Sequence, residues 1–179
     1  MKKLMIFFVI VLISSCSYDT HFTKGKVVIS KKSKIGILLF SNLSTYPNAE
    51  FLVTDSITTS LSKLPLTLID SGSIAKYYNI YRSVSYNDIE KIKTISEKAD
   101  LDYLVAGYVE EFGYRQAVFG YNEAPVVSFT VYVYNMDTIR PVFQGTYTKS
   151  NLKNSSGEED GLFNLLEEVS ECFLKDLAK

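Results

Sequence analysis

The sequence predicts one α/β domain with an α+β tendency, built on a mixed sheet of about five strands with helices packed against it. Three observations carry this prediction. One βαβ unit spans Lys34 to Ile69, three strand-like segments between Asp102 and Lys149 form an antiparallel meander, and Leu162 to Leu177 is an amphipathic C-terminal helix. Without residues 1–15, the 179-residue chain retains 164 residues, which suits a single domain with a sizeable core.

The N-terminus has the pattern of an export signal. Lys2 and Lys3 precede an unbroken apolar run from Leu4 to Ile13, and two small residues lead into Cys16. As a helix, this run would reach only ~15 Å, about half of a ~30 Å hydrocarbon layer. We therefore expect residues 1–15 to be removed as a signal peptide and not to span the membrane.

The residues from Ile13 to Cys16 resemble the lipobox of bacterial lipoproteins. The resemblance implies cleavage after Ser15 and lipidation of Cys16, which becomes the first residue of the mature protein. Each buried lipid methylene contributes ~0.8 kcal/mol, so several acyl chains tether the protein to a membrane. Ser17 is not the aspartate that resembles an inner-membrane retention signal, which favours the outer membrane, with the domain facing the periplasm. An ordinary secretory signal with a cysteine there by chance is the alternative.

Polar, mostly aperiodic residues follow the cysteine. We expect 16–33 to be the lipidated N-terminus and tether, and 34–179 to be the folded domain. His21, the only histidine, lies inside this tether and is predicted to be an exposed linker residue.

The first half of the domain alternates strands and helices. The apolar run from Lys34 to Phe40 predicts a central parallel strand, and Leu66 to Ile69 predicts a second one. The helix between them, Ala49 to Leu64, ends at Pro65. Two further helices are expected, one short over Ser73 to Arg82 and one that Ser85 caps, with the apolar stripe Ile89, Ile92, Ile95 and Ala99.

The second half is the meander. Its strands are predicted over Asp102 to Tyr114, Val126 to Asn135 and Pro141 to Lys149. The C-terminal helix places Cys172 in its apolar stripe, so we expect a buried, structural thiol.

Several sequence segments resemble those of the CsgG-like lipoproteins of curli assembly. Ile35 to Ser44, followed by a helix with Thr58 to Leu61, resembles the opening of that family, and Ala99 to Gly107 resembles the start of its third strand. The resemblance implies the family's fold. It also implies several functions, which include subunits of an outer-membrane secretion channel and activators of a peptidoglycan synthase.

The channel alternative fits this sequence poorly. A membrane strand needs ~9 to 11 residues with an apolar row. The stretch from Phe112 to Pro125 is short and carries Arg115 and Glu123, and Lys149 to Asp160 is strongly polar. The synthase-activator alternative stays open, although those members resemble a domain on a longer tether.

The residue types argue against catalysis, cofactors and nucleic acid. The signal takes two of 19 basic residues, leaving 17 against 20 acidic ones, a net charge of −3 that offers no basic field for nucleic acid. The sequence contains no phosphate-binding glycine loop, nucleophilic triad or metal-ligand spacing. Glu110 and Glu111 are adjacent on a strand, so we expect them to point to opposite faces and not to share a site. A hydrolase of envelope material is the remaining enzyme alternative.

Two surfaces are candidates for protein contact. The hairpin tip contains Tyr114, Arg115, Val118, Phe119 and Tyr121, and a tyrosine cluster contains Tyr77, Tyr78, Tyr81 and Arg82. Tyrosines that merely cap a sheet edge are the alternative for the second. The sequence therefore predicts a non-catalytic, membrane-anchored accessory or adaptor that binds other envelope proteins during assembly or secretion of a surface structure. Association with copies of itself is compatible with this prediction.

Overall fold

The computed structural model describes residues 17–27, 29–30, 32–78, 88–116, 123–151 and 159–177. Several residues of the predicted sites lie outside these ranges: Ser15, Cys16, Tyr81, Arg82, Ser85, Val118, Phe119 and Tyr121. Tyr77 and Tyr78 are described only as backbone of a helix.

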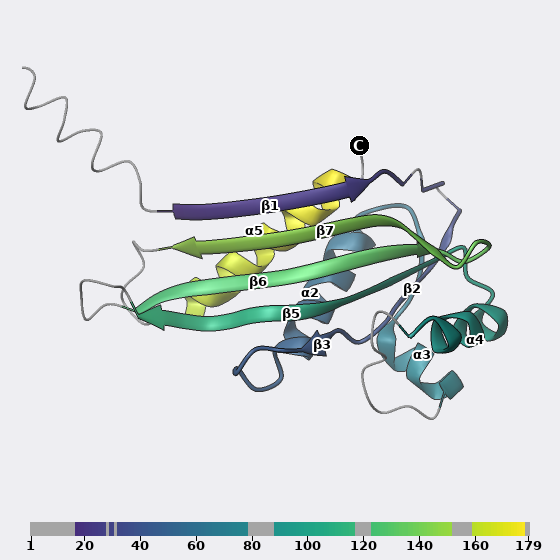
Figure 1. Ribbon diagram of the computed structural model, residues 1–179, viewed down its shortest axis with the longest axis horizontal. Coiled ribbons are helices and arrows are strands. Elements are labelled where there is room, and N and C mark those ends of the chain that lie inside the picture. Colours follow the sequence, from purple (N-terminus) through teal and green to yellow (C-terminus); the bar gives the residue numbers. More distant parts are fainter. Residues whose placement is uncertain are drawn as a thin grey trace, which may run out of the picture.

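The described chain forms one seven-stranded mixed sheet in the order β1-β7-β6-β5-β2-β4, with β3 beside β5 (Figure 1). The strands are β1 (Ser17–Gly25), β2 (Lys34–Ile37), β3 (Ser41–Asn42), β4 (Thr67–Ile69), β5 (Tyr103–Gln116), β6 (Glu123–Asn135) and β7 (Arg140–Asn151). The predicted fold class is confirmed. The strand number exceeds the expected five because β3 has only two residues and β1 lies within the predicted tether.

The predicted βαβ unit is confirmed. Strand β2 pairs in parallel with both β4 and β5, so it lies inside the sheet, as its apolar run predicts. Helix α2 (Ala49–Ser62) connects β2 to β4 and buries Val53, Ile57 and Leu61 against the sheet.

The predicted tether is wrong over its first half. Residues Ser17–Gly25 pair antiparallel with β7 in a continuous ladder from Ser17 opposite Asn151 to Gly25 opposite Phe143. His21 is therefore a strand residue opposite Tyr147, and its ring stacks on the tyrosine ring with centroids 6.0 Å apart. The polar residues of β1 fit an edge strand, which is solvated along one side.

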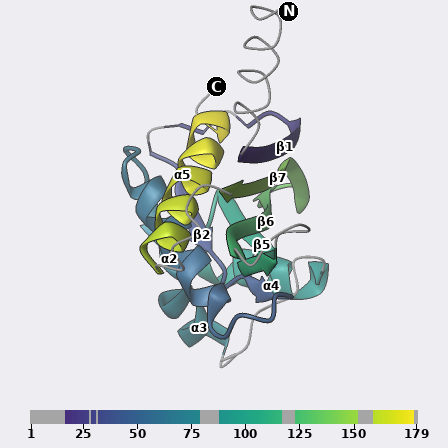
Figure 2. The same ribbon diagram turned by 90° about the vertical axis from the view of Figure 1, so that its left-hand side faces the viewer.

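The two faces of the sheet are covered unequally. Helices α2 and α5 (Glu159–Leu177) pack on one face over the meander and enclose the main core, which includes Phe129, Tyr147 and Phe173 (Figure 2). Helices α3 (Ser71–Tyr78) and α4 (Ile89–Ala99) cover the second face only at one end, near Leu104 and Tyr134. The rest of this second face, on β1, β7, β6 and β5, carries none of the described helices (Figure 1), and we refer to it as the open face.

Two local predictions about the helices need correction. The described cap of α4 is Asp88, whose carboxylate accepts a hydrogen bond from the Lys91 N–H at 3.2 Å. Cys172 is exposed, whereas its neighbours Val169 and Phe173 are buried. The thiol lies at the edge of the apolar stripe of α5, where the turn of the helix already faces solvent. None of the helices in the described ranges is both long and apolar enough to span a membrane.

Candidate functional site

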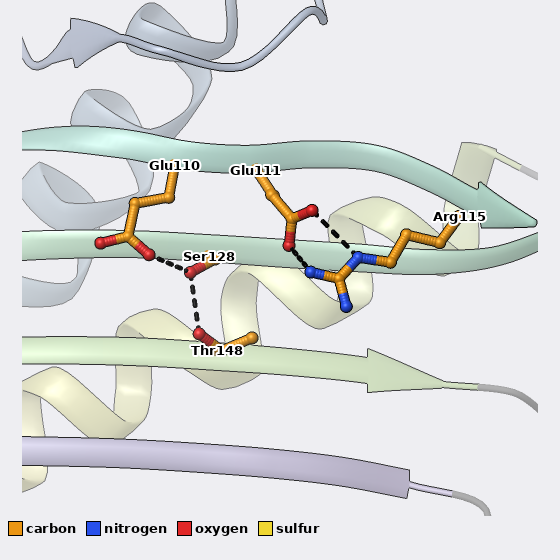
Figure 3. A network of polar contacts seen from close by, with 5 residues as sticks. All are labelled: Glu110, Glu111, Arg115, Ser128 and Thr148. Carbon is orange, nitrogen blue, oxygen red and sulfur yellow. Dashed lines mark hydrogen bonds and ion pairs between the residues drawn. The ribbon is translucent and has the colours of Figure 1, made fainter.

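Strand β5 contains a β-bulge at Glu110. Val109 lies opposite Phe129 of β6 and Glu111 lies opposite Ser128, which leaves Glu110 without a partner in the ladder. The extra residue lets Val109 and Phe112 both face the main core, while Glu110 and Glu111 both lie on the open face (Figure 3). The prediction that these carboxylates point to opposite faces is therefore wrong.

The Glu110 carboxylate is held by two hydroxyl groups of β6. Ser128 Oγ donates to Oε2 and Thr130 Oγ1 donates to Oε1, each across 2.8 Å. Two hydroxyls of β7 extend the network, because Thr148 lies 2.8 Å from Ser128 and Thr146 lies 2.7 Å from Thr130, between hydroxyl oxygens. Ser128 and Thr130 are almost completely buried and Glu110 is half-buried.

The direction of these hydrogen bonds follows from the number of protons. A hydroxyl group has one proton to donate, and Ser128 and Thr130 give theirs to Glu110. Thr148 and Thr146 must then donate to Ser128 and Thr130. All four hydroxyl dipoles point toward one carboxylate, an arrangement that stabilises a negative charge on the open face.

Glu111 has a different partner. The guanidinium of Arg115 donates through Nε to Glu111 Oε1 at 2.9 Å and through a second nitrogen to Oε2, which makes a bidentate ion pair along β5 (Figure 3). Arg115 is half exposed, with a side-chain exposure of 56%. The predicted contact residue Arg115 is thus oriented by Glu111.

The bulge also forms one wall of a cleft of about 490 Å³. The opposite wall is the loop between β3 and α2, from Leu43 to Pro47. Tyr46 of this loop packs against Phe112 with ring centroids 5.0 Å apart. Tyr114 and Arg115 of the predicted hairpin-tip site line this cleft. The side chains of the predicted tyrosine cluster lie outside what the structure describes.

Aromatic side chains lie beside the hydroxyl network. Tyr108 is directly opposite Thr130 in the ladder, and its ring centroid is 6.5 Å from that of Tyr132. Phe22 of β1 lies opposite Thr146 and is 61% exposed. Of these rings that of Phe22 is exposed, whereas Tyr108 and Tyr132 are half-buried, and aromatic side chains are enriched in protein contact sites.

Sequence reasoning missed Glu110 as a site residue, although a signal was present. Val109 and Phe112 are both core-type residues but lie three positions apart, an odd separation that strict alternation forbids. One extra residue between them resolves the conflict. In the described parts of the chain, no group of three or more His, Cys, Asp or Glu side chains is placed to hold a metal ion.

No family model matches the chain, and no curated protein matches it. Solved structures do. The PelC dodecamer from Paraburkholderia phytofirmans matches with a TM-score of 0.61 and 15% identity, covering 90% of this chain and 98% of that one. Lipoprotein GNA1162 from Neisseria meningitidis matches with a TM-score of 0.60 and 13% identity over 80% and 98% of the two chains. The hypothetical protein CT253 from Chlamydia trachomatis gives 0.53 and 15% over 82% and 98%.

These similarities establish the fold at low sequence identity. The chain shares its architecture with proteins that include a bacterial lipoprotein, over nearly the whole length of each matched chain. The finer assignment to the CsgG-like lipoproteins has no support among these matches.

Proposed function

We propose that this protein is a lipid-anchored component of the bacterial envelope that binds other envelope proteins as a non-catalytic accessory or adaptor in the assembly or secretion of a surface structure. The observation that carries the proposal is the open face of the sheet. It combines the Glu110 hydroxyl network with exposed Phe22, and none of the described helices covers it. Exposed aromatic side chains of this kind favour a protein partner.

The anchor supports the same proposal. Cys16 is bonded to Ser17, the first residue of β1, so a lipid on Cys16 would be joined to the sheet with no intervening spacer. The domain would then lie against the periplasmic side of the outer membrane, within reach of membrane-bound partners. Lipoprotein GNA1162, which has this fold, agrees with a lipid anchor.

Self-association is part of the proposal. The PelC protein, which has this fold, forms a dodecamer. We extend this property to the present chain as a proposal, with copies arranged side by side on the membrane. Activation of a peptidoglycan synthase would also proceed through protein contact, and the identity of the bound protein separates that function from an assembly role.

Photo-cross-linking in living cells tests the proposed function. A benzophenone amino acid replaces Phe22 on the open face of the full chain, and a matched variant carries it at Phe163, an exposed phenylalanine (43%) of α5. We expect cross-links from position 22 to identified envelope proteins and none of these from position 163. Identical products at both positions, or none at position 22, would contradict the proposal.

A separate experiment tests whether Cys16 carries the lipid anchor. Mass spectrometry of the mature N-terminal peptide should show lipid on Cys16, and Cys16→Ser should release the protein from membranes. An intact leader or an unmodified thiol would contradict the anchored location.

A further inference from the structure

We infer that Glu110 is the docking point for a positively charged side chain, a lysine or an arginine, presented by the protein partner that covers the open face. The inference rests on the proposed function and names the chemistry of the contact. It assigns to the β5 side of the open face a charge that the partner must complement.

Hydroxyl groups hold the Glu110 carboxylate in place. Ser128 and Thr130 donate to the two oxygens of Glu110, and Thr148 and Thr146 donate in turn to those hydroxyls. The network therefore suits a group that only accepts hydrogen bonds, which is the ionised carboxylate. Because the inner hydroxyls are buried, they hold the carboxylate at a defined position above β6 (Figure 3).

The two adjacent carboxylates of the bulge differ in how their charges are compensated. Glu111, the next residue, is paired with Arg115. Glu110 makes no ion pair with any lysine, arginine or histidine in the described ranges. A carboxylate that its own fold orients with four hydroxyls but does not neutralise can gain a charge-assisted hydrogen bond from outside.

Both oxygens of the Glu110 carboxylate can accept a further hydrogen bond. Each carboxylate oxygen has two lone-pair sites, and the two hydroxyls occupy one on each oxygen. One acceptor site per oxygen is left, which matches two donors of a guanidinium or one ammonium group. Tyr108 and Tyr132 add aromatic rings beside this position, and aromatic rings attract cations.

The occupant is a different protein with a basic contact surface. Two copies stacked through their open faces would each bring a Glu110 carboxylate to the interface, whereas charge complementarity requires the opposite sign. A partner protein can contact exposed Phe22 of β1 as well as Glu110 of β5, which a free cation cannot do.

A defined probe tests the docking point on the full chain in detergent. The probe is the capped tripeptide acetyl-Gly-Arg-Gly-amide, compared with the same peptide containing uncharged citrulline, and amide NMR shifts report binding. We expect the arginine peptide to shift the resonances of Tyr108 to Glu111 and of Ser128 to Thr130, with at least fivefold weaker binding for the citrulline peptide. If the amide shifts occurred in other residues, or if both peptides had equal effects, the inference would be overturned. This test needs only the wild-type protein.

Variants sharpen the test. Glu110→Gln keeps the size of the side chain and one acceptor oxygen but removes the charge, and should weaken arginine-peptide binding at least fivefold. Glu167→Gln makes the same charge change on the exposed side of α5 and should leave binding unchanged. If Glu110→Gln and the wild type bound the arginine peptide equally well, Glu110 would not be the docking point.

The cross-linking experiment separates the two proposals. If Glu110→Gln removes the position-22 cross-link and Glu167→Gln does not, both are supported. If the cross-link to an envelope protein survives Glu110→Gln, the proposed function stands and the docking point falls. If position 22 captures only a second copy of this chain, the open face is a contact between copies and the inference is overturned.

Discussion

Tyr147 of β7 donates a hydrogen bond from its hydroxyl to Asp176 of α5 across 3.2 Å. The same carboxylate lies 3.3 Å from Nε2 of His21 in β1. Burial, and then the nearby Asp176 carboxylate, raise the pKa of Tyr147, so its hydroxyl remains a donor at neutral pH. One carboxylate therefore joins the first strand, the last strand and the last helix, and it fixes β1 to the body of the domain.

Removing the Tyr147 hydroxyl should loosen this junction. Tyr147→Phe keeps the ring in the core but leaves Asp176 without one donor, and we expect a loss of about 1 kcal/mol in the free energy of unfolding. Urea denaturation measures it. Asp176→Asn, which retains an acceptor for the hydroxyl, should cost less than Tyr147→Phe, and the reverse order would contradict the proposed role of this hydrogen bond.

Tyr147 should also make stability sensitive to alkaline pH. Its pKa is raised in the folded protein, so the folded state holds the phenol proton more tightly than the unfolded chain, where tyrosine titrates near pH 10. The stabilisation is present below pH ~10 and is lost progressively as the pH rises above it. Melting temperatures should fall more steeply above pH ~10 in the wild type than in Tyr147→Phe, and parallel curves would count against this linkage.

Asp70 should stabilise the start of α3. Its carboxylate accepts hydrogen bonds from the Ser73 N–H at 2.8 Å and from the Ser73 hydroxyl at 2.9 Å, and the backbone hydrogen bond is the main cause of its lowered pKa. Asp70→Ala should cost about 1 kcal/mol. Because the folded pKa is lowered, this stabilisation is present above pH ~4 and is lost as the pH falls through the folded value. Chemical denaturation at pH 7 and pH 3 should show the difference between wild type and Asp70→Ala shrinking at the lower pH.

Deletion of Glu110 should leave the fold intact. The residue has no partner in the ladder, so removing it restores strict alternation through Val109, Glu111 and Phe112. Deletion of Val105 would instead turn the remaining side chains of β5 to the wrong face. We expect cooperative thermal unfolding, followed by circular dichroism, for the first deletion and none for the second. Loss of cooperative unfolding in both would show that the bulge itself is required for folding.

Cys172 should react as an exposed thiol. A maleimide added to the native protein should label it completely without denaturant, in a variant with Cys16 replaced by serine. If the thiol reacted only after the protein unfolded, the sequence-based prediction of a buried Cys172 would be correct.

The sequence determined the elements whose burial is encoded locally. The apolar run of β2, the alternation from Val127 to Val133 and the stripe of α4 each predict their own element, because one side of each must leave water. The prediction of a lipid anchor is local in the same sense, because it depends only on the few lipobox-like residues that precede β1. In the same way, Pro65 lies just beyond the end of α2.

Only the tertiary structure decided the pairings between distant segments. The polar residues of β1 form a strand because they pair with the edge of β7. The local sequence of β1 contains no pattern that predicts this pairing. The slip at Glu110 likewise depends on β6, where Phe129 and Val127 must both reach the core. Local hydrophobic patterns fix which residues are buried, but backbone hydrogen bonds to a remote strand fix register, and register places Glu110, Ser128 and Thr148 together on the open face.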